Sequence, residues 1–169
     1  MQETAVERAE LEALLLESMT NAGAFVRSSF RWPKHALTLD RLLDVFNGMR
    51  TVALATSTSA GAPRVAPIGC ALIGGQFYIP TTRTAARYRM VARQPAVSLT
   101  YFEGTTLAVI VHGHARALYP DEPDFERVDA AILAIGGSSP TTWGEAGDGC
   151  YLAVKPHAVL TYVLDPEQA

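Results

Sequence analysis

The segment between Tyr78 and Pro95 carries residue types that could bind an anion. It combines four arginines with three threonines: Thr81, Thr82, Arg83, Thr84, Arg87, Arg89 and Arg93. A guanidinium group makes paired hydrogen bonds to phosphate or carboxylate, and threonine hydroxyls add further donors. Because the whole chain has a formal charge of -3, this cluster indicates a local anion site and not a broadly basic surface.

A short helix is expected to position these arginines. Residues 84–93 contain no glycine or proline, and they lie between two runs with strand character, which predicts a helix of about two or three turns. At about 100° per residue, Arg83 and Arg87 share one face, and Arg89 and Arg93 lie roughly opposite. The threonines stand at the helix start, where free N–H groups favour an anion. We therefore predict phosphate binding by Arg87, with Arg83, Thr81 and Thr82 assisting.

Other residues that could bind a metal or a cofactor carry weaker signals. His112 and His114 would point to one face of a strand, but the sequence places no third ligand beside them, so no metal site is predicted. Their role at a subunit interface or in haem binding stays open. Trp143 stands in a glycine-rich loop, where it could cover a flat ring or anchor packing. No hydrolase or nucleotide-binding glycine motif is present.

The pattern of the chain predicts a barrel preceded by helices. Residues 1–48 read as a helical segment, with helices at 3–19 and 40–46, the second capped by Thr38. Residues 49–169 read as mostly extended, with strands at 51–57, 63–73, 76–81, 96–102, 106–119 and 151–164 and a helix at 121–135. Evenly spaced strands favour a small antiparallel barrel over a parallel sheet. Pro63, Pro67 and Pro80 predict sheet edges or bulges where they sit.

Composition limits the class of protein. With 169 residues, 49% of them hydrophobic, the chain can bury a real core as a single domain. A pI of about 5.8 argues against a general nucleic-acid binder. The acidic N-terminus does not read as a signal peptide, and no apolar run is long enough for a bilayer span. Cys70 and Cys150 form no CxxC pair, so a reduced, cytoplasmic setting is expected, without a membrane partner.

The order of these features resembles the flavin-binding split-barrel family, the pyridoxamine 5'-phosphate oxidase-like proteins. The matching text is SAGAPRVAPIG, FYIPT, AAR and RQPAVSLTY, within a span from about Met49 to Tyr119, with a looser match at the final strand. The resemblance implies a mainly β fold, a six-stranded antiparallel split β-barrel of the FMN-binding type with flanking helices. It also implies a homodimer with cofactor sites at the subunit interface.

The resemblance assigns roles position by position. The strand residues that would line the flavin are Arg64, Val65, Ala66, Pro67 and Ile68, followed on the next strand by Pro80 and Thr81. The family's phosphate-binding S-R-K falls on Ala85, Ala86 and Arg87, so only the last cation is kept, and the neighbouring threonines could replace the lost hydroxyl. The family's ring-facing lysine falls on Gly69, which argues against the oxidase reaction on pyridoxamine phosphate itself.

These observations lead to one principal hypothesis and two alternatives. The principal one is an oxidoreductase that binds FMN, or the deazaflavin F420, and acts on a small molecule, with catalytic residues not identified. The first alternative is a non-catalytic flavin- or haem-binding protein of the same fold. The second is a barrel without a cofactor that serves as an interaction module.

Overall fold

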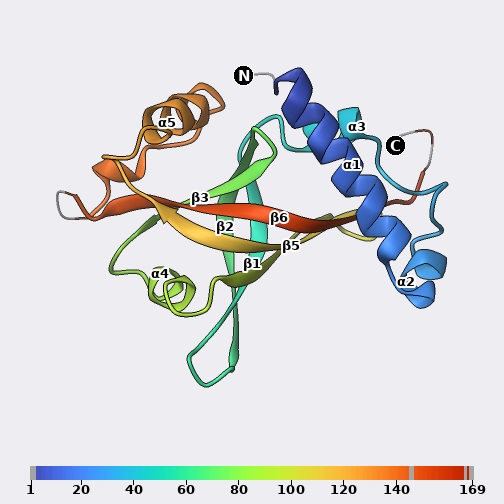
Figure 1. Cartoon of the computed structure of the whole chain (residues 1–169), viewed down its shortest axis with the longest axis horizontal. Helices are drawn as coiled ribbons and strands as arrows, with labels where there is room; N and C mark the ends of the chain where they lie inside the picture. Colours follow the sequence, from blue (N-terminus) through green and yellow to red (C-terminus); the bar gives the residue numbers. More distant parts are fainter. Residues whose placement is uncertain (1–2, 145–146, 166, 168–169) are drawn as a thin grey trace.

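The computed structural model describes residues 3–144, 147–165 and 167, and within them six strands close into an antiparallel barrel (Figure 1). The strands are β1 (Arg50–Ser57), β2 (Pro63–Ile73), β3 (Gln76–Thr82), β4 (Ala96–Glu103), β5 (Leu107–Leu118) and β6 (Gly149–Val163). Their order around the barrel is β1-β2-β3-β6-β5-β4, so the last strand lies between β3 and β5. The mainly β, six-stranded barrel predicted from the sequence is confirmed.

The helices flank this barrel. They are α1 (Ala5–Asn21), α2 (Ala24–Ser29), α3 (Leu39–Val45), α4 (Ala86–Val91) and α5 (Phe125–Ala134), with a 3-10 turn η1 (Pro140–Thr142). The Thr38 side chain caps α3 by accepting the Arg41 N–H, as expected. The short helix α2 was not predicted, because it lies in a stretch that reads as a connector. Within the described residues, no helix has the length and apolar character needed to cross a membrane.

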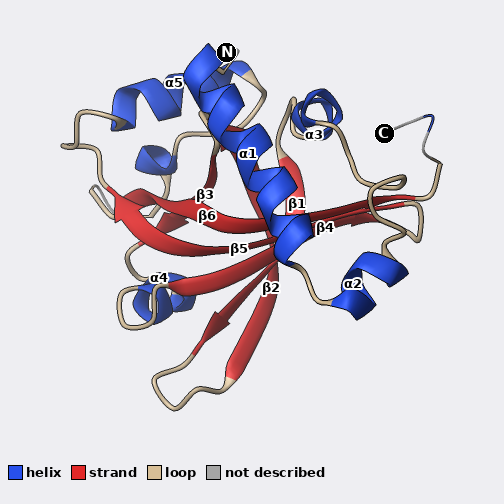
Figure 2. Cartoon of the chain, turned by 45° about the vertical axis from the view of Figure 1, so that its right-hand side comes forward, coloured by secondary structure: helices blue, strands red, loops and turns tan. Residues whose placement is uncertain are grey.

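The barrel is split because two of its seams are short. β2 pairs with β1 along eight residues, yet it meets β3 only through Ala71–Ile73, and β1 meets β4 only through Ala53–Ala55. The first half of β2 therefore projects with the end of β1 as a hairpin (Figure 2). Pro63 and Pro67 lie in this half, and Pro80 lies where β3 has left β2, so each proline has a free edge. The edges predicted from the prolines are confirmed.

Two apolar clusters hold the fold together. Alternate residues of each strand point into the barrel. Among them, Phe77 and Leu99 are fully buried. Phe46 packs edge-on to Phe77, with ring centroids 5.3 Å apart. Residues of α1 and α3 join this cluster. On another face, α5 packs against β2, β3 and β6 in a second cluster, where the Tyr151 hydroxyl donates to Asp129 Oδ1 at 2.7 Å.

The N-terminal segment forms hydrogen bonds with the second half of β6, which β3 does not pair with. β3 pairs only with the first half of β6, up to Val154. Beyond it, the Val159 N–H donates to Ser18 Oγ at 2.8 Å, and the Leu37 N–H donates to Thr161 Oγ1 at 3.0 Å. The Val163 N–H donates to the His35 carbonyl oxygen at 2.8 Å. These bonds satisfy backbone groups that would otherwise be buried without a partner.

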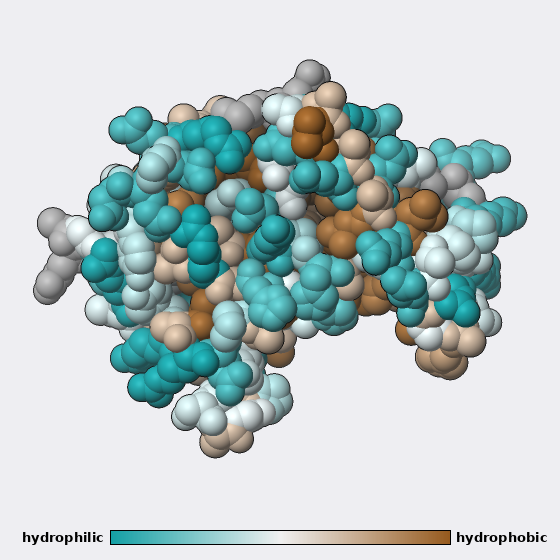
Figure 3. Space-filling view, in the orientation of Figure 1, coloured by the Kyte–Doolittle hydropathy of each residue, from teal (hydrophilic) through white to brown (hydrophobic). Residues whose placement is uncertain are grey.

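The surface in the view of Figure 1 divides by hydropathy. Figure 3 shows hydrophobic atoms gathered where the C-terminal half of α1 meets α2, and a strongly hydrophilic surface over α4. The exposed hydrophobic side chains of these two helices include Leu16 and Phe25. The polar surface over α4 belongs to the arginine-rich segment.

Candidate functional site

The end of β3 and the start of β6 form the base of the candidate site. Thr81 pairs with Cys150, and Thr82 pairs with Gly149. The turn that follows is anchored to the chain before β6, because the Arg83 N–H donates to the Asp148 carbonyl at 2.9 Å and the Thr84 hydroxyl donates to Asp148 Oδ2 at 2.9 Å. The β ladder and this turn therefore fix where the threonines and arginines stand.

Two polar atoms at this place are buried without a partner. Thr81 is 0% exposed, and among the described residues its Oγ1 has no hydrogen-bond partner. The Nε of Arg87 is buried and equally unpaired, and burial lowers the pKa of its guanidinium group. A buried unpaired polar group costs about 1–3 kcal/mol. An anion beside them would satisfy both the hydroxyl and the guanidinium.

A second cation stands beside Arg87. Burial raises the pKa of Cys150 to about 11, and the nearby guanidinium groups of Arg83 and Arg87 act against that rise. Both positive charges therefore lie close to the thiol that pairs with Thr81. Within the described chain, no carboxylate forms an ion pair with either arginine.

Arg83 and Arg87 lie near each other, as predicted, but not because they share a helix face. The helix α4 has six residues and begins at Ala86, so it is shorter than expected. Arg83 precedes it, and the turn after β3, not a shared helix face, brings Arg83 near Arg87. Arg89 and Arg93 are exposed. The other two threonines are engaged internally, since their hydroxyls lie 3.0 Å apart and the Thr84 hydroxyl donates to Asp148.

The predicted flavin-lining strand lies in the projecting hairpin. Residues 63–67 are all exposed, and Val65 is 67% exposed, whereas Ile68 is half-buried and packs on the barrel core. Thr56 of β1 pairs with Arg64, and its hydroxyl contacts Met90 Sδ of α4 at 3.2 Å. Through Thr56, the structure places the arginine-bearing helix beside the hairpin. Pro80 is buried and pairs with Tyr151.

Trp143 precedes a glycine that borders the same region. It follows η1 and is half-buried. A Cβ added to the adjacent Gly144 would lie 3.8 Å from Thr82 Cγ2. The predicted glycine-rich loop therefore reaches the threonines, although residues 145 and 146 of that loop lie outside the described residues.

Two tyrosines that the sequence reasoning missed complete the surroundings. The hydroxyls of Tyr88 and Tyr119 lie 2.7 Å apart, and Arg83 Cζ lies 4.5 Å from the centroid of the Tyr119 ring. The hydrogen bond with Tyr88 and then burial raise the pKa of Tyr119 to about 12. Both rings wall a cavity of about 320 Å³ with Leu152. No sequence signal linked Tyr119 to the arginines, because only the closure of the barrel brings them together.

The histidines lie on the outer face of the sheet. His112 Nδ1 is 2.7 Å from Ser98 Oγ, and the rings of His114 and His157 have centroids 5.2 Å apart. The described part of the chain contains no group of three or more His, Cys, Asp or Glu side chains that could hold a metal ion.

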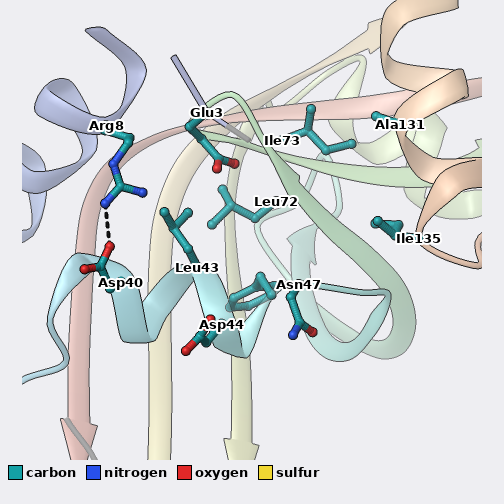
Figure 4. A pocket seen from close by; sticks show the side chains of 11 residues that line it. Glu3, Arg8, Asp40, Leu43, Asp44, Asn47, Leu72, Ile73, Ala131 and Ile135 are labelled. Carbon is teal, nitrogen blue, oxygen red and sulfur yellow. Dashed lines mark hydrogen bonds and ion pairs between the residues drawn. The ribbon is translucent and has the colours of Figure 1, made fainter. Parts of the chain in front are cut away.

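A larger cavity of about 620 Å³ lies elsewhere, among α1, α3, α5 and the end of β2 (Figure 4). Leu43 and Leu72 point into it, and the ion pair between Arg8 and Asp40 stands at one side. None of the residues predicted to bind a cofactor lines this cavity. Its volume alone therefore does not make it the candidate site.

The comparisons with known proteins agree with this architecture. The chain matches the family model described as pyridoxamine 5'-phosphate oxidase over residues 38–162. A search of curated proteins by sequence finds no match.

Solved structures share the fold at low sequence identity. A conserved hypothetical protein from Mycobacterium tuberculosis has a TM-score of 0.66 at 18% identity, over 81% of this chain and 91% of that one. An F420 reductase has a TM-score of 0.54 at 22% identity, over 69% and 94%. HutZ, a haem storage protein from Vibrio cholerae, has a TM-score of 0.63 at 16% identity, over 73% and 93%. The chain, matched by the family model over most of its length, belongs to the pyridoxamine 5'-phosphate oxidase family.

Proposed function

We propose that this protein is an oxidoreductase that binds FMN or the deazaflavin F420 and acts on a small molecule. The observation that carries the proposal is the pair of buried polar groups, Thr81 Oγ1 and Arg87 Nε, which have no hydrogen-bond partner among the described residues. Arg83 lies nearby, and in the same part of the chain neither arginine forms an ion pair. Arg87 stands where the last cation of the family's phosphate-binding segment falls on this sequence, and Thr81 lies on the strand just before that segment. A phosphate group accepts charge-assisted hydrogen bonds from such donors.

Each part of the site would have a distinct task. Arg87 would bind the phosphate, and the Thr81 hydroxyl would donate a further hydrogen bond to it. The strand from Arg64 to Ile68 would present its backbone to the ring, and Trp143 would border the phosphate end. A bound flavin would itself supply hydride or electron transfer. We assign no acid or base to the chain.

We further propose that a second copy of the chain covers the projecting hairpin. Residues 63–67 are exposed although they include Val65 and two prolines, and a cofactor and a partner subunit together would remove this surface from water. Sedimentation of the cofactor-loaded protein tests this proposal. A dimer is expected, and a monomer at micromolar concentration would contradict it.

The phosphate assignment can be tested with FMN and riboflavin, which differ only in the phosphate. Arg87→Ala should weaken FMN binding by about 2 kcal/mol, or roughly thirtyfold, because it removes a charge-assisted hydrogen bond. The same substitution should leave riboflavin affinity nearly unchanged. Arg93→Ala is the matched control, since Arg93 is an exposed arginine of the same segment. Equal losses from both substitutions, or an equal loss for riboflavin, would contradict the assignment.

The same titrations separate the cofactors. Purified protein that absorbs at the flavin bands and gains thermal stability with FMN supports an FMN enzyme, and preferential stabilisation by F420 supports the deazaflavin. A ligand present at a hundred times its dissociation constant stabilises by about 2.7 kcal/mol. Stabilisation by neither cofactor would refute the proposal.

A non-catalytic haem-binding role is the second candidate. It is favoured by the adjacent rings of His114 and His157, because imidazole is a common haem ligand. A haem titration followed by its Soret band tests this role. Loss of the bound spectrum on His114→Ala would support it, and oxidation of a reduced cofactor by an added acceptor would favour the enzyme instead.

A further inference from the structure

Arg83 is held by an unusual contact for an exposed arginine. Its guanidinium lies over the face of Tyr119, with Cζ 4.5 Å from the ring centroid, and in the described chain it forms no ion pair. A free arginine side chain samples many rotamers, and fixing them opposes binding of any ligand. The aromatic contact restrains the guanidinium before a ligand arrives.

Tyr119 is itself held through both its backbone and its side chain. The Tyr119 N–H donates to Glu122 Oε1 at 2.9 Å, and the ring hydroxyl is hydrogen-bonded to the Tyr88 hydroxyl at 2.7 Å. Glu122 is in turn bound by Arg116, 2.7 Å away. Tyr88 lies on α4, one residue after Arg87. The ring beneath Arg83 is therefore tied to the element that carries Arg87.

The choice of an aromatic face over a carboxylate has a chemical consequence. A carboxylate would hold the guanidinium but would cancel its charge and occupy its donors. A ring face attracts the cation through its quadrupole and leaves the N–H groups at the guanidinium edge free. Such a contact positions the charge and keeps it available to an anion.

We propose that Tyr119, held in place by Tyr88, is a positioning residue that aims Arg83 at the phosphate of the bound cofactor. This inference rests on the anion site of the proposed function. It adds Tyr119 and Tyr88, which the family motif does not include, and it explains how an exposed arginine outside the motif contributes to the site.

The ring face can be weakened without changing its shape. Tyr119→Phe keeps the face but loses the hydrogen bond to the Tyr88 hydroxyl, so it should lower FMN affinity about twofold, and it is the reference for the substitutions that follow. Fluorinated phenylalanines at position 119 withdraw electron density from the ring face. They should lower FMN affinity stepwise relative to phenylalanine, by about two- to fivefold in total. In an Arg83→Ala background the fluorinated series should be flat. Riboflavin affinity should not change in either background.

The outcomes separate this inference from the proposed function. A fluorinated series without effect, or one with the same effect in the Arg83→Ala background, would overturn it. If wild-type protein binds neither FMN nor F420, the proposed function fails, and the series is then measured with inorganic phosphate as the probe. Stepwise loss of phosphate binding would still support the positioning role, and phosphate binding that is absent or independent of the ring would refute it.

Discussion

Replacing Thr81 by valine should stabilise the cofactor-free protein while it damages the site. The Thr81 side chain is fully buried, and its hydroxyl has no partner in the described structure. Valine has the same shape and suits a strand, so the substitution removes a cost of about 1–3 kcal/mol without leaving a cavity. For a domain of this size, each kcal/mol raises Tm by about 2–4 °C. The hydrogen bond lost to a phosphate would lower FMN affinity roughly tenfold or more.

Thr161 provides a matched control for this experiment. It is also a buried strand threonine, but its hydroxyl accepts the Leu37 N–H at 3.0 Å. Thr161→Val should therefore lower Tm, because it leaves a buried N–H without an acceptor. Calorimetric melts of the cofactor-free proteins and FMN titrations measure both effects. If Thr81→Val lowers Tm as Thr161→Val does, or leaves FMN affinity unchanged, the reasoning about the unpaired hydroxyl is wrong.

Two further predictions concern the surroundings of the site. Gly149→Ala should lower the free energy of unfolding by about 1–3 kcal/mol or more, because the added Cβ would lie 1.8 Å from the Pro140 carbonyl oxygen; Gly23→Ala, whose Cβ would meet nothing within 4 Å, is the control in denaturant unfolding. The pKa of Tyr119 is raised to about 12, so the folded state favours the neutral hydroxyl. The stability that this hydroxyl contributes is complete below the ordinary tyrosine pKa of about 10 and is lost as pH rises towards 12. The Tm difference between wild type and Tyr119→Phe should shrink across that window, and a constant difference would contradict the assignment.

Most of the fold could be predicted because its signals are local. Alternation of apolar residues and the turn glycines placed the strands, and β2 was predicted with the bounds it has. The helix α2 was missed because its six residues carry no buried face. The arginine helix was overestimated because absence of glycine and proline permits a helix without requiring one, and the turn at Thr84 is instead bound by Asp148.

The candidate site was predictable only where a motif marks it. Arg87 and Thr81 were identified from residue types near a recognisable segment. The partners of that segment, Cys150, Asp148 and Tyr119, come from distant parts of the chain and carry no signal in their own neighbourhoods. The unpaired state of the Thr81 hydroxyl is likewise a property of tertiary packing, since every strand threonine has the same local sequence chemistry.

The position of β6 between β3 and β5 has a consequence for synthesis. β6 is the last strand in the sequence, and it pairs with both of these earlier strands. Until Gly149–Val163 has left the ribosome, β3 and β5 each present an unpaired edge that invites association with other chains. The barrel can therefore close only after β6 has been synthesised, through contacts between residues far apart in sequence.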